Sequence, residues 1–423
     1  MSPAEALVPE CEIALIGTGA APLIAAAHLL SQGRSVVVLN PDWDFFLEES
    51  ELPLDPLIPG AGGELDAGAL KRSEPEQALA ALRPHFPGAV EFWSPGSGSG
   101  AGRSAGFHDS GAPHIRQRAR LWVSPPAGAG PAFAAEDFYL RALEEGFAPK
   151  LLEGVQAASR FPGATARTTV EKGVFVAKSC DFDVNRYRIG LLEFVRERLG
   201  PSRLLCAASP IELIEGGLRV GASPLKVTER ALVFWTPRLT SWLMGAAKEA
   251  EAKRKKGATI GAHWTPVLPR GVRLWEQWTL MSKDAIDPAV IGNYADMVVW
   301  AEFEGIPEAG PGKTARRLSV LRSGALQSIE DYLSPRRGAG WADAQSFESV
   351  AALCGSLLRW SGFSVRAMRP RASFEWEPKV RPRWKIAGAP LDIEVVGGCE
   401  GPLSDVAQVA RLACESARAE APV

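Results

Sequence analysis

Apolar runs alternate with an alanine-rich stretch over the first forty residues, and this pattern predicts a strand, a helix and a second strand. Residues 13–16 are apolar, glycines stand at 17 and 19, and the alanine-rich stretch leads to a second apolar run over 36–39. A glycine turn between a strand and a helix leaves backbone N–H groups at the helix N-terminus, where they can bind a pyrophosphate. We therefore expect a dinucleotide-binding βαβ unit over residues 11–40.

The same periodicity predicts the elements of the rest of the chain. It indicates helices near 74–84, 135–146, 185–199, 242–256, 343–360 and 403–417, and strands near 203–206, 210–214, 218–220, 231–235 and 391–396. Between 259 and 304 the chain alternates apolar and polar residues, with Trp275 and Trp278 on opposite faces of one strand. Because no helix separates the strands of this region, it predicts an antiparallel sheet.

Composition narrows the class of protein. The chain has 423 residues, 46% of them hydrophobic, and a net charge of −2, which gives no reason to expect nucleic acid or a membrane as partner. Six cysteines occur without a CxxC pair and the five histidines do not cluster with them, so we expect reduced thiols and no metal site. The N-terminus lacks a signal-peptide pattern and no apolar run is long enough to cross a bilayer. We therefore expect a cytoplasmic protein that acts on a small molecule.

Three separated segments resemble the FAD-dependent oxidoreductases of the D-amino-acid oxidase and glycine oxidase type. They are the glycine turn at 17–19, the block over 183–234, and the segment Asp392-Ile-Glu-Val-Val-Gly-Gly-Cys-Glu-Gly-Pro-Leu. The resemblance implies an α/β chain with a Rossmann-like FAD/NAD(P)-binding domain around a central parallel sheet, interleaved with an α+β substrate domain that has an antiparallel sheet. The FAD-binding domain would comprise 11–105, 180–245 and 390–420, and the substrate domain 107–179 and 255–389.

The resemblance also implies which residues bind FAD and what the chain does. The positions that match the family are Gly17, Gly19 and Ala20 for the diphosphate, Asn40 for the ribose, Ile211 for the adenine, Gly62 and Gly63 beside the flavin, Thr236 in the turn after the return strand, and Gly398, Gly401, Pro402 and Leu403 at the flavin end. The implied activity is hydride transfer to the flavin from a small amine, amino acid or similar donor.

A substrate carboxylate would require an arginine, because the planar guanidinium binds a carboxylate through two hydrogen bonds. Within the presumed substrate domain, Arg273 and Arg322 are the candidates, and Tyr294 and Tyr332 are candidate hydrogen-bond donors. An ordinary strand or packing role fits each of these four residues as well. The sequence does not identify the substrate, the electron acceptor or the oligomeric state.

Three residues depart from the family pattern and support a different hypothesis. Pro22 stands at the third glycine position, Asn40 replaces the acidic ribose ligand, and Trp235 is bulky where the family has a small residue. The alternative is a degenerate flavoprotein fold that has lost catalysis or FAD binding and serves as a binding or partner subunit. A nicotinamide-dependent dehydrogenase is a third hypothesis, but it leaves the C-terminal glycine turn unexplained.

Overall fold

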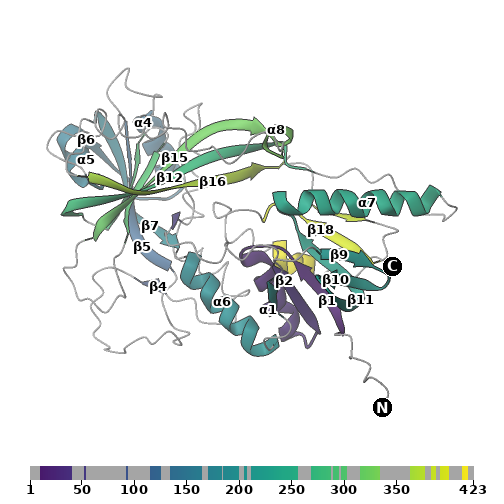
Figure 1. The fold of residues 1–423 in the computed structure, drawn as a ribbon. Coiled ribbons are helices and arrows are strands. Elements are labelled where there is room, and N and C mark those ends of the chain that lie inside the picture. The colour runs from purple at the N-terminus through teal and green to yellow at the C-terminus, as the bar shows by residue number, and fades with distance from the viewer. Residues whose placement is uncertain are drawn as a thin grey trace, which may run out of the picture.

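The described part of the computed structural model forms two β-sheets with helices packed on them (Figure 1). It comprises residues 10–40, 52–53, 92–93, 115–124, 134–163, 170–182, 184–199, 204–206, 211–255, 268–286, 289–294, 297–302, 315–333, 363–376, 383–386, 391–399 and 412–417. The helices predicted near 74–84 and 343–360 lie outside the described residues. Of the final predicted helix, the described residues 412–417 are helical.

The first sheet is mainly parallel and has the strand order β17-β18-β11-β1-β2-β8. Its strands are β1 (Glu10–Ile16), β2 (Val36–Asn40), β8 (Leu204–Cys206), β11 (Ser223–Phe234), β17 (Arg383–Ile386) and β18 (Ile393–Val396), with β9 (Ile211–Ile214) and β10 (Gly217–Val220) extending it from β11. Strand β1 pairs in parallel with both β2 and β11, and β17 is antiparallel at the edge. The predicted βαβ unit and central parallel sheet are therefore confirmed.

Helices cover both faces of this first sheet. Helices α1 (Ala20–Ser31) and α6 (Val184–Leu199) pack on one face, and α7 (Thr240–Lys255), which follows the short helix η4 (Pro237–Leu239), packs on the other. Along β1, Ile13 and Leu15 belong to the α1 side, whereas Ala14 and Ile16 belong to the α7 side. Burial of both faces explains why these strands are apolar throughout instead of alternating.

The second sheet is mainly antiparallel, as predicted, and has the order β16-β12-β15-β14-β13-β5-β7-β3. Its strands are β3 (Leu52–Pro53), β4 (Phe92–Trp93), β5 (Ile115–Val123), β6 (Lys150–Glu153), β7 (Lys172–Phe182), β12 (Gly271–Ile286), β13 (Val290–Tyr294), β14 (Met297–Glu302), β15 (Ala315–Ser328) and β16 (Phe363–Glu375). Strand β5 is parallel to β13 and β4, which the sequence did not indicate. Helices α4 (Ala135–Glu144) and α5 (Gly154–Arg160) cover opposite faces, and α8 (Ile329–Leu333) follows β15.

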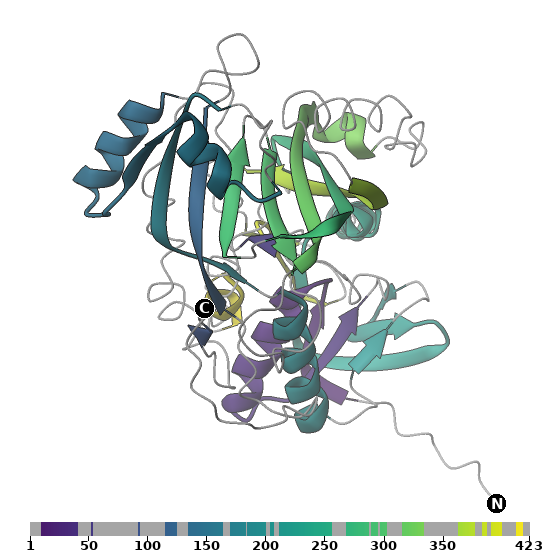
Figure 2. The same cartoon turned by 90° about the vertical axis from the view of Figure 1, so that its left-hand side faces the viewer.

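The two sheets use alternating stretches of the chain, so the two units are interleaved. Figure 2 shows the second sheet above the first, with α6 beside the lower unit. Strands β3 and β4 pair within the second sheet, and β17 pairs within the first. The domain boundaries themselves stay a prediction. Within the described ranges, no helix combines the length and apolar character needed to cross a membrane.

Candidate functional site

Two glycine turns follow the carboxyl ends of two parallel strands, β1 and β18, and so leave the first sheet on the same side. Strand β11 lies between β1 and β18, with Ile16 paired to Val233 and Val233 paired to Val395. Neighbouring strands lie about 4.8 Å apart, so the turns that begin at Gly17 and Gly397 are separated by about 10 Å. From β1 the chain continues to β2 on one side of β1, and the later strands β11 and β18 are added on the other side of β1. This change of direction between β1 and β11 is the position where α/β sheets bind ligands.

The first turn fits a diphosphate. A Cβ on Gly17 would lie 2.8 Å from the Cβ of Phe234, so a side chain has no room there. Gly19 has φ 79° and is the N-cap of α1, whose first turn has neither a side-chain cap nor an acidic residue. The first N–H groups of α1 are therefore available to an anion at the ligand-binding edge of the sheet.

Pro22 and Asn40 are accommodated without disturbing this arrangement. Pro22 is buried in the first turn of α1, where a missing N–H removes no helical hydrogen bond. Asn40 ends β2, pairs with Cys206 and is 1% exposed. It presents a neutral amide at the position where a carboxylate would bind a ribose hydroxyl.

Trp235 packs away from the glycine turn. Phe234 lies against Gly17 on the α1 side, whereas Trp235 belongs to the apolar cluster on the α7 side. Its ring meets those of Phe374 and Trp376 edge-on, with centroids 5.2 Å and 5.5 Å away. The bulk of Trp235 therefore fills the interface with the second sheet.

Thr236 follows in an extended conformation, with φ −140° and ψ 158°, so its side chain returns to the side of Phe234. Its hydroxyl is buried and has no hydrogen-bond partner among the described residues. Buried hydroxyl groups ordinarily have a partner. An unsatisfied hydroxyl beside the glycine turn, together with the uncapped N-terminus of α1, fits the diphosphate part of a dinucleotide such as FAD.

The remaining predicted cofactor residues are only partly covered by the structure. Gly398, with φ 80°, lies in the turn after β18. Ile211 opens β9 and is buried in the cluster on the α7 side. Gly62, Gly63, Gly401, Pro402 and Leu403 lie outside the described residues. The roles of all these residues stay predictions.

The four predicted substrate contacts do not come together. Arg273 forms an ion pair with Glu375 at 3.1 Å, and both side chains are partly exposed. Arg322 lies on the same face of β15 as Leu318 and Val320. These two residues belong to the apolar cluster around α5, and this face of the second sheet points away from the first sheet.

Of the two tyrosines, Tyr294 shares a face with Arg322, because Met297 pairs with both residues, whereas Tyr332 lies elsewhere. Tyr294 is buried in the cluster around α5, edge-on to Phe161 with centroids 6.2 Å apart, and burial raises the pKa of its phenol. Tyr332 lies in α8 against Phe374, 5.8 Å between centroids. Burial also raises the pKa of Tyr332, partly offset by the charge of Arg238. The structure therefore brings Arg322 and Tyr294 onto one face but does not gather all four side chains around one substrate.

A different set of buried polar side chains shares the face of the second sheet that contacts the first unit. Trp275, Ile291 and Trp300 mark this face, because they belong to the same buried cluster as α1 and Cys399. The buried polar residues on it are Arg118 and Arg120 of β5, Gln277 of β12, Asn293 of β13 and Ser319 of β15. The sequence analysis missed this set. Its signal is the strand Ile115-Arg-Gln-Arg-Ala-Arg-Leu, which has arginine at every second position.

Arg120 and Trp300 lie in one row across this face. Arg120 pairs with Ile291, Ile291 pairs with Trp300, and Trp300 pairs with Ser319. The indole Nε1 of Trp300 is buried and has no acceptor within the described ranges. The neighbouring Arg118 donates from Nη1 to the carbonyl of Ala301 at 2.9 Å. Two buried guanidinium groups and an indole N–H make this face suited to a carboxylate.

The sequence matches no described protein family and no curated protein. The structure, in contrast, is similar to solved oxidases. This chain has the fold of the D-amino-acid oxidase and glycine oxidase type. Iminodiacetate oxidase from Chelativorans sp. BNC1 aligns with a TM-score of 0.55 at 11% identity over 96% of this chain and 93% of that chain. NikD, an unusual amino acid oxidase essential for nikkomycin biosynthesis, aligns with a TM-score of 0.59 at 12% identity over 97% and 94%.

Glycine oxidase from Geobacillus kaustophilus aligns with a TM-score of 0.52 at 10% identity, over 96% of this chain and 93% of that chain. Because the alignments extend over nearly the whole chain, they include both sheets and the order in which the chain visits them. The resemblance and the fold class expected from the sequence are therefore confirmed. At these identities the similarity concerns the fold.

Proposed function

We propose that this chain is an FAD-dependent oxidoreductase that oxidises a small amine or amino acid at the carbon next to nitrogen. The observation that carries the proposal is the convergence of two glycine turns, at Gly17 and Gly397, on either side of β11 at the ligand-binding edge of the sheet. That edge adjoins the face of the second sheet that carries buried arginines. The similar structures are themselves named as oxidases of iminodiacetate, glycine and other amino acids.

The residues at the first turn would hold the cofactor. Gly17 lets the turn pass close to Phe234, and the N–H groups at Ala20 and the next residue would bind the diphosphate oxygens. Asn40 would hydrogen-bond the ribose, and Thr236 would donate its buried hydroxyl. Bound FAD would supply the hydride acceptor for the oxidation.

The buried face of the second sheet would bind the substrate. Arg118 and Arg120 attract a carboxylate, and the indole N–H of Trp300 offers a directed hydrogen bond. Trp275 and Trp300 contribute apolar surface that excludes water from the reacting carbon. This arrangement favours an amino acid over a simple amine, because only the amino acid has a group for the arginines.

A second candidate is the degenerate fold without FAD. It is supported by Asn40 at the ribose position and by the continuous apolar cluster from α1 to Trp300. A protein of this kind would keep the fold and bind a partner protein, but it would take up no flavin.

The visible absorption spectrum of the purified full chain separates the two candidates. A yellow protein, or a colourless one that acquires flavin bands after addition of FAD, supports the oxidoreductase. A colourless protein that fails to bind added FAD contradicts it. Anaerobic mixing with amino acids and with the corresponding decarboxylated amines then tests the substrate class, because only a substrate bleaches the flavin bands.

A further inference from the structure

Trp376 follows a strand of the second sheet in the sequence, but its side chain packs against the first sheet. It directly follows Glu375, the last residue of β16. A Cβ built on Gly397 would lie 2.3 Å from Cη2 and 2.4 Å from Cζ2 of Trp376. The six-membered part of the indole therefore lies against the backbone of Gly397, and only glycine leaves room for it.

Gly397 is the first residue after β18, so the indole rests where the C-terminal glycine turn begins. Gly398 follows with φ 80°, a conformation that favours glycine. On the strand side, the backbone N–H of Trp235 donates to the carbonyl of Val396 at 2.8 Å. The rings of Trp235 and Trp376 meet edge-on, 5.5 Å apart at 87°. The turn is thus held by one aromatic residue from each sheet.

We propose that Trp376 is a positioning residue for the cofactor. It fixes the backbone at Gly397 and Gly398, where the turn after β18 begins, so the affinity for FAD depends on a side chain that follows the last strand of the substrate sheet. This inference rests on the proposed function. Two consecutive glycines have wide backbone freedom once the indole is removed. FAD would then have to order the turn on binding, and that cost lowers the affinity.

The test is a titration of the full-length apoprotein with FAD, followed by flavin fluorescence. We expect Trp376→Ala to weaken binding by about tenfold or more, and Trp376→Phe to stay within about threefold of the parent chain, because a ring still covers Gly397. Gly397→Ala should also weaken binding, because its methyl group displaces the indole. In the Trp376→Ala background, Gly397→Ala should add little, because the two substitutions act through one contact.

Trp122→Ala is the matched control. Trp122 is also a buried tryptophan of the second sheet, and it packs against Phe138 of α4 with ring centroids 4.8 Å apart. Its replacement should lower the temperature of unfolding and leave the FAD affinity of the folded protein unchanged. Hydrogen exchange of the Trp235 amide, measured without FAD, gives a second readout. Exchange should become faster in Trp376→Ala and stay unchanged in Trp122→Ala.

The outcomes separate this inference from the proposed function. If the parent chain binds no FAD, the proposed function is wrong. If the parent chain binds FAD and Trp376→Ala binds it equally well with unchanged Trp235 exchange, the positioning role is wrong and the proposed function stands. Should Trp376→Ala fail to fold, Gly397→Ala decides, and an unchanged FAD affinity in that variant overturns the inference.

Discussion

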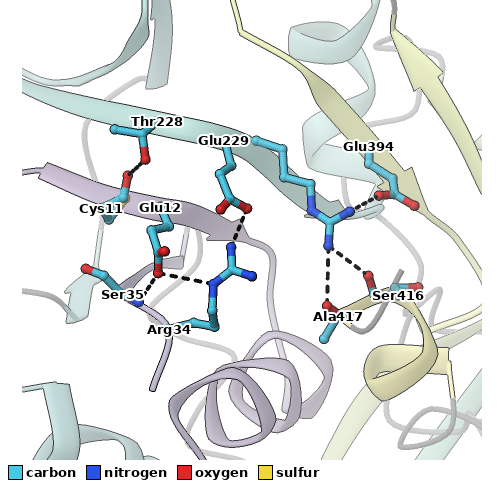
Figure 3. A network of polar contacts seen from close by, with 10 residues as sticks. Cys11, Glu12, Arg34, Ser35, Thr228, Glu229, Glu394, Ser416 and Ala417 are labelled. Carbon is cyan, nitrogen blue, oxygen red and sulfur yellow. Dashed lines mark hydrogen bonds and ion pairs between the residues drawn. The ribbon is translucent and has the colours of Figure 1, made fainter. Parts of the chain in front are cut away.

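Arg230 and Glu394 form a buried ion pair across the neighbouring strands β11 and β18, with 3.1 Å between Nη1 and Oε2 (Figure 3). The Arg230 side chain is 10% exposed and that of Glu394 is 2% exposed. The other nitrogen, Nη2, donates to the backbone carbonyls of Ser416 and Ala417 at 3.4 Å and 3.3 Å. One guanidinium thus ties the sheet to the C-terminal helical residues 412–417.

Loss of Glu394 should therefore destabilise the protein strongly. Glu394→Ala leaves the Arg230 charge buried without its carboxylate, and removal of one partner of a buried pair costs about 3–5 kcal/mol. Chemical denaturation measures this change in the free energy of unfolding. The control is Glu10→Ala, which breaks the exposed pair of Glu10 with Lys226 in the same sheet and should change stability by less than about 1 kcal/mol. Equal effects of the two substitutions would contradict the assigned role of burial.

The Glu12 carboxylate gives a pH-dependent contribution to stability. It accepts hydrogen bonds from the Ser35 backbone N–H at 2.6 Å and from Arg34 Nε at 3.2 Å, and these lower its pKa from the ordinary value of 4.5. A carboxylate with a lowered pKa in the folded state stabilises the protein fully above its unfolded pKa, and the contribution is lost as the pH falls through the folded pKa.

We therefore expect the parent chain to be more stable than Glu12→Gln above pH 4.5, and the difference to shrink at lower pH. Because Glu12 is 38% exposed, the difference at neutral pH should stay below about 1 kcal/mol. Denaturation curves of both proteins at several pH values measure it. A difference that grew on acidification would be inconsistent with the lowered pKa.

Gly17 tests the close approach at the first turn. Gly17→Ala places a methyl group 2.8 Å from the Cβ of Phe234, and such overpacking costs about 1–3 kcal/mol. It should also weaken FAD binding, because the turn must shift. Gly245→Ala is the control, since a Cβ at Gly245 in α7 meets no atom within 4 Å. Alanine is the better helix former, so this control should raise stability by about 0.5–1 kcal/mol.

Periodicity predicted most described elements because a strand or helix displays its buried face in the order of its own residues. Helix α6, for example, was expected over 185–199 and spans Val184–Leu199. Periodicity does not indicate whether the polar face of a strand meets solvent or another sheet. In β5 the arginines at 118 and 120 alternate with apolar residues, which is typical of a strand with one face in water.

The structure instead places those arginines at 1% and 0% exposure. The covering side chains come from elements distant in the sequence, so no local pattern could identify them. The same limitation applies to Trp235, whose bulk suggested a blocked cofactor turn. Alternation along β11 directs the indole to the α7 side, where it packs against Phe374 and Trp376. The sequence could predict the fold and the first glycine turn but not the buried polar face.

Substrate kinetics should distinguish this buried face from the arginine candidates identified by sequence. Trp300→Phe retains the ring and removes the buried N–H, and Arg120→Lys retains the charge and removes the planar fork. For an amino acid substrate we expect each change to raise KM by about tenfold, the value of one hydrogen bond to a charged group. Arg322→Lys alters an arginine on the opposite face and should leave KM unchanged.

Steady-state rates with an amino acid and its decarboxylated amine complete the comparison, because the amine lacks the carboxylate and should be insensitive to Arg120→Lys. A larger effect at Arg322 than at Arg120 would move the substrate to the other face of the sheet.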